Sequence, residues 1–196
     1  MVKHFFITGQ QRSRTAWLAS LFTDERSYCY HDAMRTVSKL PCLEDAVDPK
    51  RLEGEYEHVG DSDNGLPLFP SALDYFYKKD PNLPVAIVDR NPGDSIASLL
   101  KMQYPGLSSE ACRHAVSAST DGIERIAQGP NVMRVRYDKL SDVDTLDELS
   151  QHLIGRVINR DRLLAMTERN IQIQEPAYSA GFSPEFAQAV RLVVGL

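Results

Sequence analysis

Five short apolar runs along the chain have the composition of buried β-strands. The clearest of them, at residues 84–89, reads P-V-A-I-V-D and lacks the polar alternation of a half-exposed strand. The expected strands are residues 3–8, 27–30, 56–60, 84–89 and 132–137. Because an uninterrupted apolar run fits a strand that is covered on both faces, the pattern favours a parallel sheet.

Helical patterns alternate with these runs. The expected helices are residues 15–23, 71–79, 92–103, 108–128 and 145–154, and a last helix begins at Ser183 and Pro184. The helix after the central strand has clear start signals, since Asn91 can cap it and Pro92 suits its first position. Strands alternating with helices predict an α/β fold with a parallel central sheet and helices on both faces, in one domain that spans residues 1–196.

Composition narrows the classes of protein. The net charge of −5 argues against a general nucleic-acid or membrane-surface binder, whose footprint would be basic. Cys29, Cys42 and Cys112 are widely spaced, which favours reduced thiols over a disulfide framework or a zinc site. The apolar run at the N-terminus is too short for a signal peptide, and no segment approaches the roughly 18 apolar residues of a membrane span. We therefore expect a cytoplasmic protein without nucleic-acid or membrane partners.

The first expected strand runs through a short polar loop directly into a helix. Residues 5–22 read F-F-I-T-G-Q-Q-R-S-R-T-A-W-L-A-S-L-F. A loop that ends at a helix N-terminus points free N–H groups and the positive end of the helix dipole at one place, where phosphate or sulfate binds. Arg12, Ser13, Arg14 and Thr15 add charge and hydroxyl donors. The segment predicts an anion-binding loop, and the alternative is an ordinary basic surface turn.

This loop departs from the P-loop of nucleoside triphosphatases, G-x-x-x-x-G-K-[ST]. Counted from Gly9, Arg14 stands in place of the second glycine, Thr15 in place of the lysine, and Ala16 in place of the hydroxyl that holds Mg²⁺. The sequence therefore indicates anion binding without the usual lysine and metal ligand.

A second informative segment, V-D-R-N-P-G-D-S-I-A-S, follows the central strand. Arg90 directly follows that strand, and Ser98 lies about two turns into the next helix. Ligands of open α/β sheets bind outside the carboxyl ends of the strands, so one ligand with two phosphates could bridge the anion-binding loop and Arg90. The alternatives are that Arg90 pairs with Asp89 or Asp94, that Ser98 bonds to a helix carbonyl, and that Asp89 is the Mg²⁺ ligand of a Walker B strand.

Three segments in this order resemble those of the sulfotransferases that use 3′-phosphoadenosine-5′-phosphosulfate (PAPS). Q-R-S-R-T-A-W-L is similar to the 5′-phosphosulfate loop P-K/R-S-G-T-T-W-L, and R-N-P-G-D-S-I-A-S matches the 3′-phosphate motif R-[ND]-P-x-D-x-x-x-S. V-M-R-V-R-Y-D-K-L resembles the V-x-Y-E-D-L segment, whose tyrosine lies by the adenine. The resemblance implies a P-loop NTPase-like sulfotransferase fold, in a short bacterial or phage-type version without a membrane anchor, with PAPS as cofactor and no metal.

The resemblance also assigns roles to individual residues. The implied cofactor-binding residues are Gln11, Arg12, Ser13, Arg14, Thr15, Ala16, Trp17, Arg90, Ser98 and Tyr137. Arg12 would contact the transferred sulfuryl group and stabilise its charge. Arg14 replaces the usual glycine, and Ala16 removes one hydroxyl. The late R-K-G segment of many members is missing after residue 140. Either Arg90 and Ser98 suffice, another cation such as Arg160 or Arg162 contributes, or the affinity for the cofactor is modest.

The base that activates the acceptor hydroxyl has several candidates. His31 and Asp32 end the second strand, at the same edge of the sheet as the loop, and histidine titrates near neutrality. The rivals are His58 and the segment Asp61, Ser62 and Asp63, which also reads as an ordinary turn and is the candidate substrate-binding segment. The acceptor would be a small molecule or a carbohydrate, and the sequence leaves its identity and the oligomeric state open.

Two other functions stay open at this point. One is a P-loop kinase or nucleotide hydrolase in which Asp89 holds Mg²⁺. The other is a catalytically inactive nucleotide-binding module.

Overall fold

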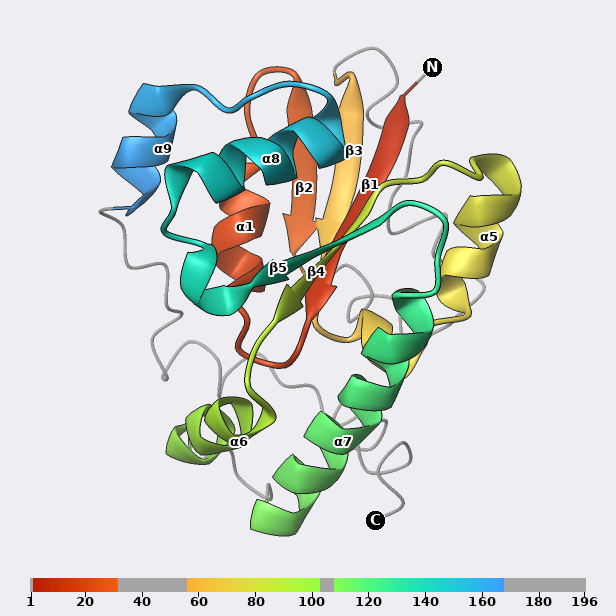
Figure 1. The fold of residues 1–196 in the computed structure, drawn as a ribbon, viewed down its shortest axis with the longest axis vertical. Coiled ribbons are helices and arrows are strands. Elements are labelled where there is room, and N and C mark those ends of the chain that lie inside the picture. Colours follow the sequence, from red (N-terminus) through yellow and green to blue (C-terminus); the bar gives the residue numbers. More distant parts are fainter. Residues whose placement is uncertain (1, 32–55, 103–107, 168–196) are drawn as a thin grey trace.

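The computed structural model describes residues 2–31, 56–102 and 108–167. Its centre is a five-stranded sheet in the order β2-β3-β1-β4-β5, in which every neighbouring pair is parallel (Figure 1). The strands are β1 (Lys3–Gly9), β2 (Ser27–His31), β3 (His58–Ser62), β4 (Val85–Asp89) and β5 (Val132–Arg136). The predicted α/β fold with a parallel central sheet is confirmed. Four of the residues named in the sequence analysis lie outside these ranges: Asp32, Cys42, Ser183 and Pro184.

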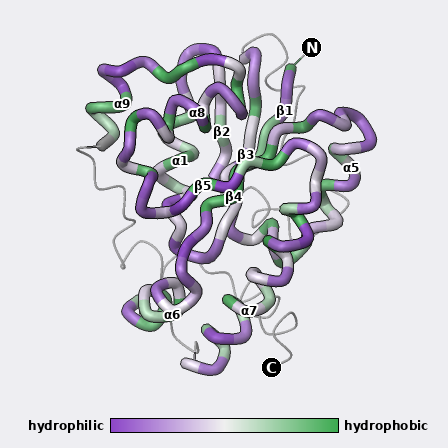
Figure 2. The backbone as a smooth tube through the Cα atoms, viewed as in Figure 1, coloured by the Kyte–Doolittle hydropathy of each residue, from purple (hydrophilic) through white to green (hydrophobic). Residues whose placement is uncertain are grey.

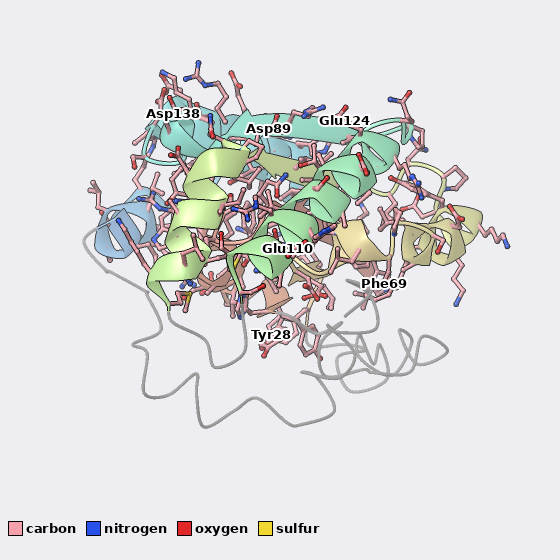
Figure 3. The ribbon with its side chains drawn as sticks, turned by 90° about the horizontal axis from the view of Figure 1, so that it is seen from below. Tyr28, Phe69, Asp89, Glu110, Glu124 and Asp138 are labelled. Carbon is pink, nitrogen blue, oxygen red and sulfur yellow. The ribbon has the colours of Figure 1, made fainter. Side chains whose placement is uncertain are left out.

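Helices cover both faces of the sheet and cross its carboxyl edge. They are α1 (Thr15–Leu21), α5 (Ala72–Lys79), α6 (Pro92–Lys101), α7 (Ser109–Ile126), α8 (Val143–Ile154) and α9 (Arg160–Thr167), with 3₁₀ helices η2 (Leu66–Leu68) and η3 (Tyr137–Lys139). Seen from below the carboxyl edge, α6 and α7 lie side by side (Figure 3). In the parts of the chain that the structure describes, no helix combines the length and apolar character needed to cross a membrane.

The alternation of side chains along β1 divides the core into two layers. Phe5 and Ile7 pack with residues of α1, α8 and α9, among them Leu18 and Leu149. Phe6 faces the other layer and packs against α5 and α7. Hydrophobic and hydrophilic segments alternate along the helices, as expected for helices with one buried face (Figure 2). Each fully buried side chain of this kind contributes about 1.5–3 kcal/mol to folding.

The third strand ends two residues later than its apolar pattern predicts. The expected strand stops at residue 60, but β3 runs to Ser62, so Asp61 and Ser62 are buried strand residues and not part of a turn. Backbone pairing with β1 extends the strand, since the Asp63 N–H donates to the Ile7 carbonyl (2.9 Å) and the Thr8 hydroxyl donates to the Asp63 carbonyl (2.7 Å). Tertiary hydrogen bonds thus outweigh the low strand propensity of aspartate.

Helix α9 was not predicted from the sequence pattern. Asn159 starts it by accepting a hydrogen bond from the Asp161 N–H at 2.8 Å. Leu163 and Met166 are buried in the same core layer as Trp17, whose indole N–H donates to the Met166 carbonyl at 2.9 Å. The helix is short and mostly polar, and packing onto α1 accounts for its position.

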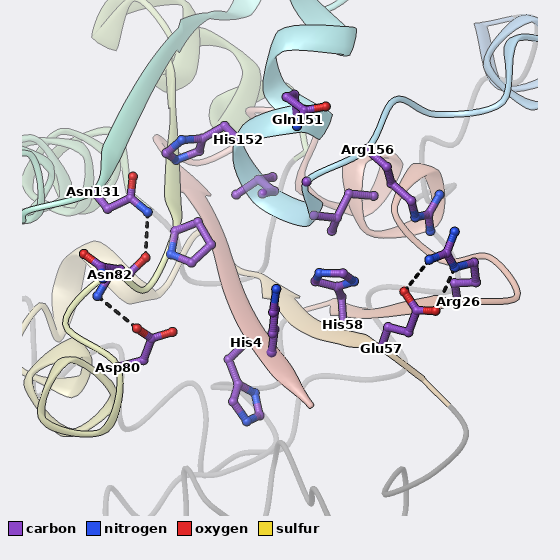
Figure 4. A pocket seen from close by; sticks show the side chains of 15 residues that line it. His4, Arg26, Glu57, His58, Asp80, Asn82, Asn131, Gln151, His152 and Arg156 are labelled. Atoms are coloured by element: carbon purple, nitrogen blue, oxygen red, sulfur yellow. Dashed lines mark hydrogen bonds and ion pairs between the residues drawn. The ribbon is translucent and has the colours of Figure 1, made fainter. Parts of the chain in front are cut away.

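The amino edge of the sheet holds a pocket of about 520 Å³, far from the anion-binding loop (Figure 4). His4 and His58 line it at the starts of β1 and β3, where His58 is in register with Lys3. The structure therefore does not bring His58 to the carboxyl edge, and His58 is removed from the candidates for the base. Burial lowers the pKa of both histidines, and the charges of Lys3 and Arg156 lower the pKa of His58 further.

A close approach between β3 and β1 generates the first prediction. A Cβ on Gly60 would lie 2.3–2.5 Å from ring atoms of Phe5, which is fully buried. We expect Gly60→Ala to lower the free energy of unfolding by about 1–3 kcal/mol through overpacking, measured by urea denaturation. In the Phe5→Leu variant, adding Gly60→Ala should lower the free energy of unfolding by less than it does in the wild type. Equal stability of Gly60→Ala and wild type would contradict the close contact.

The histidines of the pocket generate a second prediction. Because the pKa of each is lower in the folded state, the unfolded chain binds more protons as the pH falls below about 6.5, and the free energy of unfolding should decrease from pH 7.5 to pH 5.5. The double variant His4→Gln/His58→Gln should show a flatter pH dependence, measured by urea denaturation at each pH. His114→Gln, on the exposed face of α7, is the matched control and should keep the wild-type slope. Identical slopes in all three proteins would rule out this contribution.

Candidate active site

The carboxyl edge of the sheet collects residues from all five strands. The loop after β1 leads into α1, His31 ends β2, Ser62 ends β3, Arg90 follows β4, and Tyr137 follows β5. Because all strands are parallel, these positions meet at one edge, next to α6 and α7 (Figure 1). This is the edge at which the sequence predicted an anion site.

The backbone of the loop has an unusual conformation. Arg12 and Arg14 adopt positive φ angles of 69° and 63°, in the left-handed region that non-glycine residues seldom occupy. Left-handed residues within a turn orient successive N–H groups toward one concave centre, which suits an anion. Arg14 is the residue before α1 and makes no side-chain cap, so the first-turn N–H groups of the helix remain for a ligand.

Ser13 supplies a hydroxyl inside this turn. Its side chain is fully buried, and its Oγ has no hydrogen-bond partner among the described residues. A Cβ on Gly9 would lie 2.7 Å from that Oγ and 2.5 Å from the Val88 carbonyl oxygen, so the loop needs glycine to fold against β4. A buried hydroxyl without a partner is costly, and an oxygen of a bound anion would satisfy it.

Thr15 links the loop to the second strand. It is buried at the start of α1, and its Oγ1 lies 3.3 Å from Nε2 of His31 in a hydrogen bond. The structure therefore brings His31 to the loop, as expected for a base that acts beside the anion. Asp32, the other candidate at this strand end, lies outside the described residues.

Three arginines surround the same edge. Nε of Arg12 donates to Oγ of Ser98 at 3.3 Å, and Nη1 of Arg90 donates to the backbone carbonyl of Arg12. The guanidinium carbons of Arg90 and Arg14 lie 4.4 Å and 5.3 Å from the ring centroid of Tyr137. Nε of Arg90 is buried without a hydrogen-bond partner among the described residues. The structure thus joins the three predicted segments through direct contacts.

The three arginines of this cluster are not held in salt bridges within the described part of the chain. Within the described ranges, Arg12, Arg14 and Arg90 form no ion pair with a carboxylate. The arginines that do form one are Arg26, Arg134, Arg136, Arg156 and Arg160. The edge is therefore locally positive in an acidic chain, which favours an anionic ligand.

The alternatives for the second segment can now be judged. Asp89 forms an ion pair with Arg134 at 2.7 Å, and Arg134 also pairs with Glu124 at 3.1 Å. Asp89 is thus paired with Arg134 and not with Arg90. Ser98 accepts a hydrogen bond from Arg12 and so contributes to the loop. Asn91 caps α6 as predicted, accepting from the Gly93 and Asp94 N–H groups.

The two late arginines do not reach the site. Arg162 donates to the carbonyls of Ser20 (2.7 Å) and Leu21 (3.3 Å) and so caps the carboxyl end of α1, at the opposite end of that helix from the loop. Arg160 pairs with Asp147 at 2.6 Å. The structure therefore gives no support to the alternative in which Arg160 or Arg162 contributes to the phosphate site, because both side chains are engaged elsewhere.

Not every residue of the predicted loop presents its side chain to a ligand. The Trp17 indole is a core group, 7% exposed, and only the backbone N–H groups of Trp17 and Ala16 lie in the first turn of α1. If Trp17 takes part in cofactor binding as predicted, it does so through its backbone N–H and not through its buried indole.

Gln11 and its neighbour Gln10 anchor the loop to α7. Nε2 of Gln11 donates to Oγ of Ser119, and Nε2 of Gln10 donates to Oγ1 of Thr120, both at 2.6 Å. The sequence pattern did not identify Gln10, Ser119 or Thr120 as residues of the site. The hydroxyls lie more than 100 positions further along the chain, and no local pattern in a helix marks such a contact.

The segment Asp61, Ser62 and Asp63 lies beside the loop but beneath its surface. All three side chains are at most 1% exposed. Asp63 accepts a hydrogen bond from the Gly65 N–H and so closes the turn after β3. Their predicted contact with a substrate stays a prediction.

Comparison with known proteins points to one fold. No family model and no curated protein matches the sequence. The structure is similar to the crystal structure of a sulfotransferase from Alicyclobacillus acidocaldarius, with a TM-score of 0.62 and 16% identity over 100% of this chain and 96% of that chain. It is also similar to the sulfotransferase domain from the curacin biosynthetic pathway, with a TM-score of 0.57 and 13% identity over 89% and 80% of the two chains. The chain therefore has the fold of the sulfotransferases.

Proposed function

We propose that this protein is a sulfotransferase that moves a sulfuryl group from PAPS to a hydroxyl of a small-molecule or carbohydrate acceptor. The observation that carries the proposal is the convergence of Arg12, Arg90 and the buried hydroxyl of Ser13 at one sheet edge, where the described residues offer the hydroxyl no hydrogen-bond partner and the two arginines no carboxylate partner. Such an arrangement leaves donors and positive charge for a polyanionic ligand.

The donor set fits the two charged ends of PAPS. The N–H groups before and within the first turn of α1, with Ser13 and Thr15, suit the 5′-phosphosulfate. Arg90 and Ser98 suit the 3′-phosphate, and the buried Nε of Arg90 has a donor left for it. When bound, PAPS supplies an activated sulfuryl group on a phosphate leaving group.

In this proposal, Arg12 stabilises charge on the leaving oxygen. Its Nε is directed to Ser98, and its backbone carbonyl accepts from Arg90, so both ends of the residue are fixed. A fixed cation that faces developing negative charge lowers the barrier without reorganisation. The remaining N–H groups of its guanidinium are available for the sulfuryl oxygens.

His31 is the residue that we assign as base. Its Nε2 is at the loop, 3.3 Å from Thr15 Oγ1, where an acceptor hydroxyl in line with the sulfuryl group would approach. Neutral imidazole can take that proton at physiological pH. Asp32 is the alternative base at the same strand end.

Nucleotide binding tests the proposal without knowledge of the acceptor. By calorimetry, adenosine 3′,5′-bisphosphate should bind in the absence of metal and more tightly than ATP with Mg²⁺. Arg90→Ala should weaken bisphosphate binding by about 10- to 100-fold, because it removes a charge-assisted hydrogen bond. Arg136→Ala is the matched control, since Arg136 ends β5 at the same edge but pairs with Asp138. A preference for ATP with Mg²⁺ would instead support a kinase or nucleotide hydrolase.

Turnover tests the role of Arg12. With radiolabelled PAPS and a panel of phenols and sugars as acceptors, Arg12→Ala should lose about 100-fold or more of the activity, because a fixed cation at the leaving oxygen is removed. Arg113→Ala, on the exposed face of α7, serves as control, and circular dichroism should show both variants folded. Full activity of Arg12→Ala would overturn the assignment. Binding of the bisphosphate without transfer to any acceptor would indicate an inactive nucleotide-binding module.

A further inference from the structure

We infer that Arg14 joins Arg90 on the ring of Tyr137 to form the 3′-phosphate subsite, and that Arg14 thereby sets the preference of this protein for a bisphosphorylated nucleotide. The inference rests on the proposed function and gives Arg14, until now only one of the residues of the cofactor-binding loop, a specific role that the related loops cannot have, because they carry glycine at this position.

The backbone of Arg14 gives the first reason. Its φ of 63° is a conformation that glycine adopts freely and that a side chain makes unfavourable. Glycine would therefore be the relaxed choice at this position, and the arginine side chain is kept despite the strain. Strained non-glycine residues of this kind concentrate at ligand-binding loops.

The position of the side chain gives the second reason. Arg14 is exposed, and its guanidinium lies over the ring of Tyr137. Its hydrogen bond to Oγ of Ser141 is long, at 3.5 Å, and it forms no ion pair with a carboxylate in the described ranges. The five arginines that pair with carboxylates show that such partners are common in this chain. The guanidinium of Arg14 thus keeps most of its donors for a ligand.

Arg90 completes the geometry. Its guanidinium carbon is 4.4 Å from the centroid of Tyr137, and that of Arg14 is 5.3 Å from it, so the two carbons lie less than 10 Å apart. The ring of Tyr137 thus brings both guanidinium groups to one part of the carboxyl edge, where the N–H donors of each can serve the same anionic ligand. Arg160 and Arg162, the two late cations considered from the sequence, are engaged elsewhere, whereas Arg14 lies beside Arg90 on the same ring.

Tyr137 has a positioning role in this arrangement. Its ring contacts both guanidiniums through cation–π interactions, which restrict their orientation before a ligand binds. This role differs from the contact with adenine that the resemblance implies, because the ring is here engaged by the two arginines.

The experiment compares two ligands that differ by one phosphate. Dissociation constants for adenosine 3′,5′-bisphosphate and adenosine 5′-monophosphate are measured by calorimetry for wild type, Arg14→Gly and the control Arg136→Gly. We expect the preference for the bisphosphate to fall by about 10- to 100-fold in Arg14→Gly, while the affinity for the monophosphate changes by less than about threefold. The melting temperature of Arg14→Gly should be unchanged or higher, because glycine relieves the positive φ.

Each other outcome has a definite meaning. An unchanged preference in Arg14→Gly, or an equal loss for both nucleotides, overturns the assignment of Arg14 to the 3′-phosphate and leaves the proposed function standing. Failure of the wild type to bind either nucleotide overturns the proposed function and this inference together.

A second pair of variants tests the positioning role of Tyr137. Tyr137→Phe keeps the ring and should retain the wild-type preference for the bisphosphate. Tyr137→Leu removes the ring and should lower the preference by about 10-fold or more, with little effect on the monophosphate. Equal behaviour of Phe and Leu at this position overturns the role of the ring.

Discussion

The pairing of β1 with β3 on one side and β4 on the other is the constraint on which the site depends. Ile7 is in register with Ser62, and Gly9 is in register with Val88, so the loop after β1 begins between the ends of both neighbours. Since the three strands run in the same direction, every side chain that follows them arrives at one edge. The close approach of Gly9 to Val88 then lets the loop turn back over β4, toward Arg90.

The arginines at the carboxyl edge make different contacts from several arginines elsewhere in the molecule. The chain is acidic, and several other arginines pair with carboxylates, among them the exposed pairs Arg26–Glu57 and Arg136–Asp138, which contribute little stability each. At the carboxyl edge, the guanidiniums of Arg12, Arg14 and Arg90 instead contact a hydroxyl, an aromatic ring and a backbone carbonyl. These contacts orient the cations without neutralising them. A positive site within an acidic protein concentrates a polyanion at one place on its surface.

The shape of the loop is maintained by contacts from outside it. Arg12 and Arg14 hold left-handed conformations that their own propensities disfavour, and Arg14 provides no side-chain cap for α1. Gln10 and Gln11 hydrogen-bond the loop to α7, and Arg90 donates a hydrogen bond to the carbonyl of Arg12. Such cross-links can hold a strained backbone in place before a ligand binds, which reduces the ordering cost of binding.

Much of the fold could be predicted from the sequence, because its determinants are local. The apolar run of β4, the start signals of α6 and the strand–loop–helix order at the N-terminus each depend on neighbouring residues. These features fixed the α/β class and placed the loop and Arg90 at the same edge. The sequence pattern did not predict α9 and ended the third strand two residues too early, because packing on α1 and pairing with β1 decide those boundaries.

The partners of the site residues were beyond the sequence, because they are set by contacts between distant segments. The sequence by itself determined which residues would gather at the carboxyl edge. Only the tertiary structure decided that Asp89 is held by Arg134, that Arg162 caps α1, that the Trp17 indole belongs to the core, and that Arg14 and Arg90 share one aromatic ring. A side chain's partner depends on the register of the sheet and the packing of the helices, and neither is encoded in any short stretch of chain.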